Sequence, residues 1–282
     1  MKIHATLLLL GAGLLLSLRP AAAESNHCTP ISALPITLSS AGVYCLTQDL
    51  TMAGSNGVAV FVNADSVTLD LNGHALRSNA AGNMSTFGVS VVGQKYFTIT
   101  DGTIVGFAQA VYVGSAGGTN AKSGLISNLK VQRSHTIGIS ALCDGCVVRD
   151  NMVTDTNIPA SFGGNAAIGI GVSGTGNQVI GNRVFNTFSQ PGDPAFGISV
   201  SGSNSNVANN YSANDHISSD ATYGYSIIGT NALLSTNQVQ GMTVGYNLTA
   251  TNLKYRDNLS GGCTYAFNGV SVGGVHDLGG NN

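Results

Sequence analysis

Five ionisable residues in the middle of the sequence carry the side chains that acid/base chemistry requires. They are Arg133, His135, Asp155, Asp215 and His216. An imidazole can abstract a proton, a guanidinium can neutralise a carboxylate next to the reacting carbon, and two carboxylates can serve as acid and base in hydrolysis. These residues lie far apart in the chain, so they can act together only if the fold brings them to one surface.

A repeated Asn indicates how the fold could do so. Short apolar segments that end in Asn or Asp recur at intervals of about 20 to 30 residues, which is typical of stacked solenoid repeats. The repeated positions are Asn72, Asp101, Asn128, Asn151, Asn182, Asn210, Asn237 and Asn258. We expect these side chains to form a column that bonds the turns of successive coils, so their role is structural.

Between these turns the sequence predicts short strands. Segments such as VTLDL, FTIT, GISV and YSIIG are rich in β-branched residues and are bounded by Gly, Asn and Asp. No helical segments alternate with them. We therefore expect an all-β fold, a single right-handed parallel β-helix of about eight coils over residues 24–282. Its caps are expected at residues 24–60 and at about residues 255–282.

Alignment of the coils on the Asn column places the ionisable residues on a similar side. Asp155 lies four residues after a column position, Arg133 and Asp215 lie five after, His216 six and His135 seven. Two interpretations stay open, a catalytic face and a solvated turn whose charges have no function. Residues 155–165 and 188–195 are expected to leave the coil as loops and could form the walls of a cleft.

Three further residues are candidates for substrate binding, namely Arg183, Tyr211 and Tyr223. Tyrosines can stack on sugar rings, but they could equally cap the C-terminal end of the core. For Arg183 the alternative is a surface ion pair with Asp150 on the neighbouring coil.

The first 23 residues have the features of a secretory signal peptide. A basic residue, an apolar run and small residues up to Ala23 follow one another, and the apolar run is too short to span a bilayer. We expect a secreted or periplasmic protein without membrane insertion. Removal of the signal would take away Lys2 and Arg19, and the weakly acidic chain that remains argues against nucleic acid as a partner.

The five cysteines are therefore expected in an oxidising compartment. Cys28 and Cys45 are predicted to form a disulfide that holds the N-terminal cap. Cys143 and Cys146, in the sequence CDGC, are either a disulfide across a turn or two partly buried thiols. Cys263 is left over, and we expect it to be buried.

Several stretches resemble the right-handed parallel β-helix repeat family of the pectate-lyase-like superfamily. They are CTPISALPITLSSAGVYCLTQDL, VTLDLNGHAL and FGISVSGSNSNVANNYSAN, and the resemblance covers about residues 28–265. It implies the β-helix fold and a packed, structural role for His74 in LNGHAL. The superfamily includes lyases, hydrolases, epimerases, phage tailspikes and non-enzymatic proteins.

From this resemblance we expect an exported protein that binds polysaccharide along its parallel sheet, with β-elimination as the associated reaction. One alternative is a non-catalytic β-helix protein, either an envelope or adhesion module or a carbohydrate-binding protein. A second is a glycoside hydrolase, for which Asp155 and Asp215 are the nominated carboxylates. No metal site is predicted, and no cofactor or oligomeric state is specified.

Overall fold

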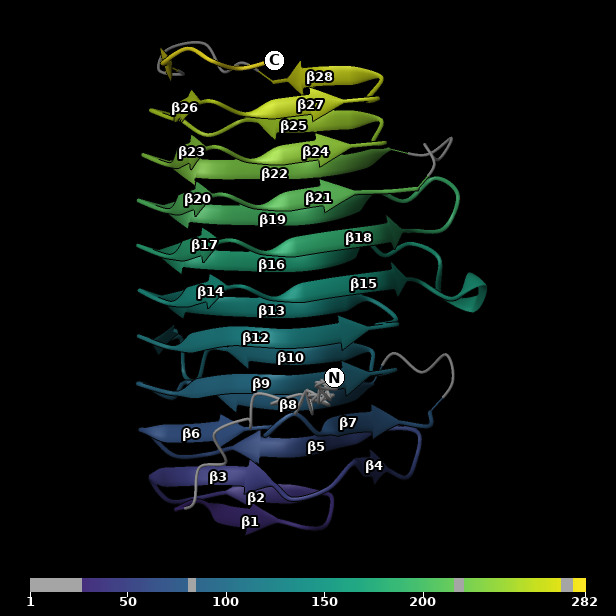
Figure 1. Cartoon of the computed structure of the whole chain (residues 1–282), viewed down its shortest axis with the longest axis vertical. Helices are drawn as coiled ribbons and strands as arrows, with labels where there is room; N and C mark the ends of the chain where they lie inside the picture. The colour runs from purple at the N-terminus through teal and green to yellow at the C-terminus, as the bar shows by residue number, and fades with distance from the viewer. Residues whose placement is uncertain (1–26, 81–84, 216–220, 270–275) are drawn as a thin grey trace, which may run out of the picture.

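The computed structural model describes residues 27–80, 85–215, 221–269 and 276–282. The expected signal peptide and the candidate His216 lie outside these residues. The described chain winds into a parallel β-solenoid (Figure 1), interrupted by one short 3-10 helix, η1 (Ala160–Phe162). The expected all-β fold, a right-handed parallel β-helix, is confirmed.

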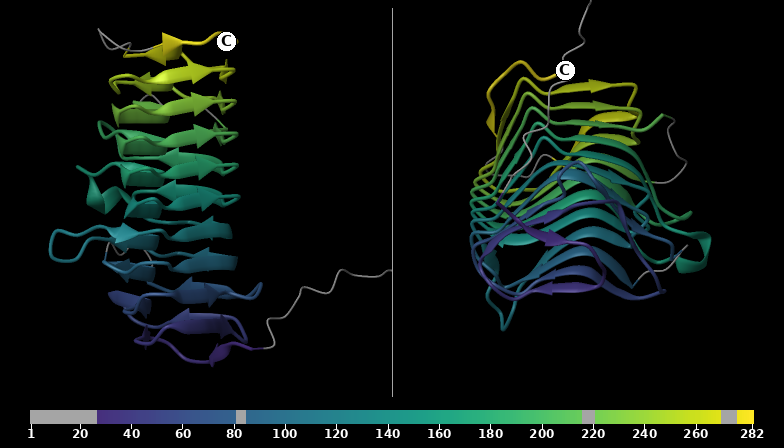
Figure 2. Two further views of the ribbon diagram at one scale, coloured as in Figure 1. Left: turned by 90° about the vertical axis from the view of Figure 1, so that its left-hand side faces the viewer. Right: turned by 60° about the horizontal axis from the view of Figure 1, so that its bottom comes forward.

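The strands form three faces that run along the solenoid (Figure 2). The first face contains β2 (Ile36–Leu38), β5 (Gly57–Val62), β8 (Thr86–Val92), β10 (Gln109–Gly114), β13 (Ile137–Asp144), β16 (Ala167–Thr175), β19 (Ala195–Ser203), β22 (Thr222–Thr230), β25 (Val244–Leu248) and β28 (Tyr265–Asn268), with β11 (Ala121–Lys122) beside β13. The second face contains β1 (Thr29–Ile31), β3 (Gly42–Leu46), β6 (Val67–Asp70), β9 (Thr98–Val105), β12 (Leu125–Gln132), β14 (Val147–Arg149), β17 (Gln178–Ile180), β20 (Asn206–Ala208), β23 (Leu233–Ser235), β26 (Lys254–Arg256) and β29 (His276–Asp277). The third face contains β4 (Leu50–Met52), β7 (Ala75–Ser78), β15 (Met152–Asn157), β18 (Arg183–Phe188), β21 (Tyr211–Ala213), β24 (Gln238–Gln240) and β27 (Leu259–Gly261), and β9 and β12 continue onto it.

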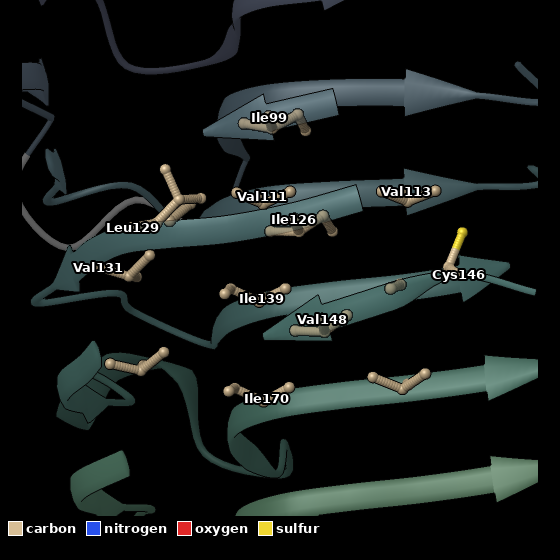
Figure 3. Packing of buried hydrophobic residues seen from close by; sticks show 14 of the residues in the cluster. Ile99, Val111, Val113, Ile126, Leu129, Val131, Ile139, Cys146, Val148 and Ile170 are labelled. Atoms are coloured by element: carbon tan, nitrogen blue, oxygen red, sulfur yellow. The ribbon is translucent and has the colours of Figure 1, made fainter. Parts of the chain in front are cut away.

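Alternating apolar residues fill the space between the faces. On the second face Val148 pairs with Val179, and Val179 pairs with Val207 in the next coil. All three side chains are buried. In each strand alternate residues point into the solenoid, and the in-register pairing places these three valines on the same inward side. Figure 3 shows the same arrangement for neighbouring coils, where Ile99, Ile126 and other aliphatic side chains stack inside the solenoid. Each coil therefore buries its apolar side chains against the coils before and after it.

Five Asn residues form a buried column at the corner between the second and third faces, namely Asn151, Asn182, Asn210, Asn237 and Asn258. In each step the backbone N–H and the side-chain Nδ2 of one Asn both donate to Oδ1 of the next. Nδ2 also reaches a backbone carbonyl of the preceding coil, as in the 2.8 Å bond from Asn182 to Val148. The column continues to Asn281 near the end of the chain. The predicted structural column is confirmed from Asn151 onward.

The prediction was wrong for Asn72, Asp101 and Asn128. In the coil of Asn128 the inward position belongs to Leu129, which is buried and whose N–H donates to Asn151 Oδ1 at 3.1 Å. Asn128 is exposed, one residue earlier, with φ of 55°. Asn72 and Asp101 also have left-handed φ values, of 51° and 57°. Asn suits both the left-handed corner and the inward position beside it, so the residue type alone does not distinguish the two.

Three aromatic rings stack inside the C-terminal coils. Tyr225 and Tyr246 are fully buried, with ring centroids 5.0 Å apart and an interplanar angle of 11°. Phe267 continues the stack at 4.8 Å from Tyr246. The Tyr246 hydroxyl donates to the backbone carbonyl of Asn237 at 2.7 Å. Tyr225 and Tyr246 are therefore core residues of these coils.

Two disulfides are present. Cys28 is bonded to Cys45, with Cα atoms 5.7 Å apart, so the predicted N-terminal bridge is confirmed. Cys143 is bonded to Cys146 across the turn between β13 and β14, and both sulfurs belong to buried residues. Cys263 is free and half-buried rather than buried.

Candidate functional site

Three of the polar residues at the corner between the third and first faces form a hydrogen-bonded row. Asn186 lies between two carboxylates, and its Nδ2 donates to Asp155 Oδ1 at 3.5 Å and to Asp215 Oδ2 at 3.4 Å. The backbone N–H of Asp215 donates to Asn186 Oδ1 at 3.1 Å. Asp155 and Asn186 have φ values of 57° and 56°, which place their side chains at the outside of the turn. The structure therefore brings two of the predicted residues, Asp155 and Asp215, into one row.

Arg133 lies at the same corner, one coil before Asp155. Its φ is 53°, its side chain is exposed, and its N–H donates to the carbonyl of Thr154 at 3.0 Å. Because Leu129 takes the inward position, Arg133 aligns with Asp155 itself rather than with the residue after it. His135 follows two residues later, half-buried, with its N–H bonded to the carbonyl of Phe107. Arg133, Asp155, Asn186 and Asp215 thus follow one another on successive coils.

A cationic and aromatic cluster lies on the third face beside this row. The guanidinium carbon of Arg183 is 5.6 Å from the centre of the Phe185 ring and 5.7 Å from that of Tyr211. The two rings are tilted by 53° with their centroids 5.3 Å apart. Arg183 and Phe185 are alternate residues of β18, and Tyr211 pairs with Arg183 from the next coil. Arg183, Phe185 and Tyr211 are called the platform below.

A surface pocket of about 400 Å³ adjoins the platform. Its lining comes from the corner between the second and third faces and includes Arg183, Asn209, Tyr211, Thr236 and Gln238. The size falls within the range of small-molecule sites. The Tyr211 hydroxyl donates to Gln240 Oε1 at 3.0 Å, which fixes the ring beside the pocket. The pocket therefore combines an aromatic ring, a cation and several amide and hydroxyl groups.

One predicted interaction differs in the structure, and Tyr223 lies on a different face from Tyr211. Asp150 is bonded to its neighbour Arg149 at 3.0 Å, and Arg183 lies over the aromatic rings, so the predicted Asp150–Arg183 pair is wrong. Tyr223 lies on the first face, away from Tyr211, and stacks on Phe196 with centroids 5.1 Å apart and an angle of 16°. Rings stacked along the solenoid direct their flat faces at each other, whereas the tilted platform rings do not.

The two loops that were predicted to form walls lie against each other. The Ser189 hydroxyl donates to the carbonyl of Asn165 at 2.8 Å, and the N–H of Gly164 donates to the Asp193 carboxylate. Ile158, Ala167 and Ala195 form a small separate core beneath them. In Figure 1 the loop with η1 projects beside β15. The loops thus stand at the same corner as the Asp155–Asn186–Asp215 row.

Sequence reasoning missed a second pocket, which lies on earlier coils at the corner between the second and third faces. It has a volume of about 500 Å³ and is lined by Asp70, Asn72, Gly73, Asp101, Gly102, Thr103, Asn128 and Lys130. Three of these residues had been assigned to the internal column. If the alignment is shifted by one residue, so that the apolar Leu129 takes the inward position, these three residues are predicted to face outward. It also missed Phe185, although alternation along β18 places Phe185 beside Arg183.

The comparisons with known proteins find relatives through structure alone. No family model and no curated protein sequence matches the chain. The structure of XylC with xylose matches with a TM-score of 0.57 and 14% identity, over 76% of this chain and 38% of XylC. DFA-IIIase from Arthrobacter chlorophenolicus A6 in complex with GF2 matches with a TM-score of 0.54 and 14% identity, over 77% of this chain and 55% of the enzyme.

Pectate lyase Pel9A matches with a TM-score of 0.52 and 12% identity, over 85% of this chain and 70% of the lyase. Identities this low establish the fold and leave the activity open. The chain has the parallel β-helix fold that it shares with these structures.

The β-helix shows no metal centre among its described residues, where no three His, Cys, Asp or Glu side chains are grouped to hold an ion. His74 lies on the coil of the second pocket, with Nδ1 3.6 Å from Asp49 Oδ1. Asp49 also binds Arg77 at 3.2 Å, and the bond from the Ala75 N–H together with that arginine lowers the pKa of the carboxyl.

Within the ranges that the structure describes, none of the helices has the length and apolar character needed to cross a bilayer.

Proposed function

We propose that the protein binds polysaccharide along its third face, and that the platform is the principal contact. The observation that carries this proposal is the Arg183–Phe185–Tyr211 cluster beside a pocket of about 400 Å³. Aromatic rings offer apolar faces to sugar rings, while amides, hydroxyls and a guanidinium bind sugar hydroxyls and carboxylates.

The regular geometry of the solenoid supports the same proposal. Successive coils are about 4.8 Å apart, so one column of outward residues offers a contact at each coil to an extended polymer. Met152, Arg183, Tyr211 and Gln238 follow one another in such a column on the third face. The matched structures include a pectate lyase and a complex of XylC with the sugar xylose.

Cleavage by β-elimination is the second candidate function, and the row at the neighbouring corner favours it. Arg133 would neutralise a uronate carboxylate, and His135 would take the proton from the carbon next to that carboxylate. Asp155 and Asp215, which both accept a hydrogen bond from Asn186, would position sugar hydroxyls. The same two carboxylates would be the acid and base of a glycoside hydrolase. Without turnover, the platform would serve a carbohydrate-binding envelope or adhesion protein.

Export is part of the proposal. The N-terminal segment has signal-peptide features, and both disulfides fit an oxidising compartment. We propose a secreted or periplasmic location.

The test is a panel of neutral and uronate polysaccharides measured by affinity electrophoresis and calorimetry. Tyr211→Ala and Arg183→Ala should each weaken binding of the retained polysaccharide by about tenfold, from lost stacking and a lost charged hydrogen bond. Tyr223→Ala is the matched control, because it removes a half-exposed tyrosine from the first face. Binding that withstands both platform substitutions would refute the proposed surface. Release of unsaturated uronate products, followed by ultraviolet absorbance, tests the lyase activity.

A further inference from the structure

The pocket of about 500 Å³ lies at the corner between the second and third faces, on coils that precede those of the platform. Lys130 and Arg183 belong to one outward column, since Lys130 pairs with Met152 and Met152 pairs with Arg183. The two cations are therefore two coils, or about 10 Å, apart. This second pocket, called the corner pocket, is separated from the platform by the exposed Met152 and by the Arg149–Asp150 ion pair.

The corner pocket exists because the internal Asn column stops at Asn151. In the preceding coils the inward positions are held by Leu129 and Gly102, which pair with each other. A Cβ atom on Gly102 would lie 2.3 Å from Leu71 Cβ and 2.7 Å from the His74 carbonyl, so this close approach of coils needs glycine. Asp101 and Asn128 consequently occupy the left-handed corner positions and stand in the pocket wall.

The groups that line the pocket are chemically suited to one kind of ligand. Asp70 and Asp101 already accept bonds from the Asn72 N–H at 2.6 Å and from the Thr100 hydroxyl at 2.7 Å, which hold the two carboxylates in place. Carboxylates accept hydrogen bonds from hydroxyls, the Lys130 ammonium donates them, and the amides of Asn72 and Asn128 do both. A ligand rich in hydroxyls can satisfy all of these groups at once.

The charge of the lining separates this pocket from the platform. Two carboxylates and one ammonium give a net negative lining, which opposes an anionic sugar, whereas the platform carries a single guanidinium. We infer that the corner pocket is a second carbohydrate-binding site that takes an uncharged, hydroxyl-rich sugar unit. The inference does not depend on binding at the platform.

The experiment uses the mature protein and methyl glycosides of glucose, galactose, mannose and xylose, observed by saturation-transfer NMR and titration. Methyl galacturonoside is the matched charged probe, since it differs from methyl galactoside only in its carboxylate. Asp101→Asn keeps a residue that tolerates φ of 57°, and Lys130→Met keeps the length of an exposed side chain. Each should weaken binding of the uncharged glycoside by about tenfold, through loss of a charged hydrogen bond.

Two variants serve as controls. Asp257→Asn makes the same change at a left-handed corner position far along the solenoid, with φ of 53°, and should leave glycoside binding unchanged. The two pocket substitutions are also made in the Arg183→Ala background, where a platform contact is missing, so a loss of glycoside binding there is assigned to the corner pocket and not to the platform. The inference is overturned if no uncharged glycoside binds saturably, if methyl galacturonoside binds more tightly than methyl galactoside, or if the two pocket variants bind as the wild type does.

Discussion

Asn182 donates both its backbone N–H and its Nδ2 to a single atom, Oδ1 of Asn210, at 2.9 and 3.0 Å. Its own Oδ1 accepts the same pair of bonds from Asn151. Each member of the column therefore satisfies buried donors of the coil before it and depends on an acceptor from the coil after it. Because these groups are removed from water, each unpaired one would be costly.

Replacement of Asn182 by Leu should destabilise the fold by about 1–3 kcal/mol for each buried group left unpaired. The groups concerned are the N–H and Nδ2 of Asn151 and the carbonyl of Val148. Urea unfolding followed by far-ultraviolet spectroscopy measures the change. Asn128→Gly is the matched control at an exposed left-handed position, and it should change stability by less than about 1 kcal/mol. If Asn182→Leu leaves the free energy of unfolding unchanged, the Asn column does not contribute to stability as argued.

Loss of the Cys28–Cys45 disulfide should destabilise the exported protein by about 3 kcal/mol in the chain-entropy model, since the bridge closes a separation of 17 residues. The double variant to serine tests this by thermal unfolding. Removal of the Cys143–Cys146 bridge, with a separation of 3, should have a smaller entropic effect of about 2 kcal/mol. Detection of Cys28 and Cys45 as free thiols by mass spectrometry would contradict the arrangement of the N-terminal coil.

Stability should fall in alkaline solution as tyrosines ionise in the unfolded chain. Burial raises the pKa of Tyr225 and of Tyr246 well above the ordinary value of 10.0. A group whose pKa is raised by folding contributes stability that is complete below its unfolded pKa and is lost as the pH rises toward the folded value. Unfolding free energy should therefore decrease above about pH 10. Tyr246→Phe should make this decrease shallower, and an unchanged slope would count against the buried phenol.

His135→Ala should abolish turnover of any polysaccharide that the protein cleaves and leave the unfolding midpoint nearly unchanged. The imidazole is half-buried beside the corner that carries Arg133 and Asp155, which is suited to proton abstraction. Rates of product formation and thermal melts measure the two effects. His74→Ala is the control histidine on an earlier coil. If His135→Ala lowers stability and leaves turnover intact, the histidine is structural.

Most of the fold could be predicted from the sequence because each coil of a solenoid is formed by one short, contiguous segment of the chain. Period-two alternation in segments such as that of Val179 indicates strands, and the regular Asn marks one corner of each coil. The contact between Arg183 and Tyr211 could also be predicted from the sequence, since each residue directly follows an Asn of the column. Position relative to the column is sufficient when the column is identified correctly.

The corner pocket could not be predicted in the same way. Asn128 and Asn151 are both Asn after a short apolar segment, yet one is exposed and the other is buried. The difference depends on whether the interior at that level has room for an amide or is filled by Leu129, which is a property of packing between coils. Pairs such as Arg149 and Asp150 likewise depend on rotamers that the repeat pattern does not encode.

The stack formed by the buried Tyr225 and Tyr246 with the half-buried Phe267 also provides an intrinsic spectroscopic probe of the C-terminal coils. The chain has no tryptophan, so tyrosines dominate its near-ultraviolet absorption, and rigidly stacked rings give strong circular dichroism in that band. These rings belong to β22, β25 and β28 at one end of the solenoid. Dichroism in the near ultraviolet will therefore follow the C-terminal coils, while dichroism in the amide band follows all coils. A difference in midpoint between the two melting curves would show whether the C-terminal coils unfold separately from the rest of the solenoid.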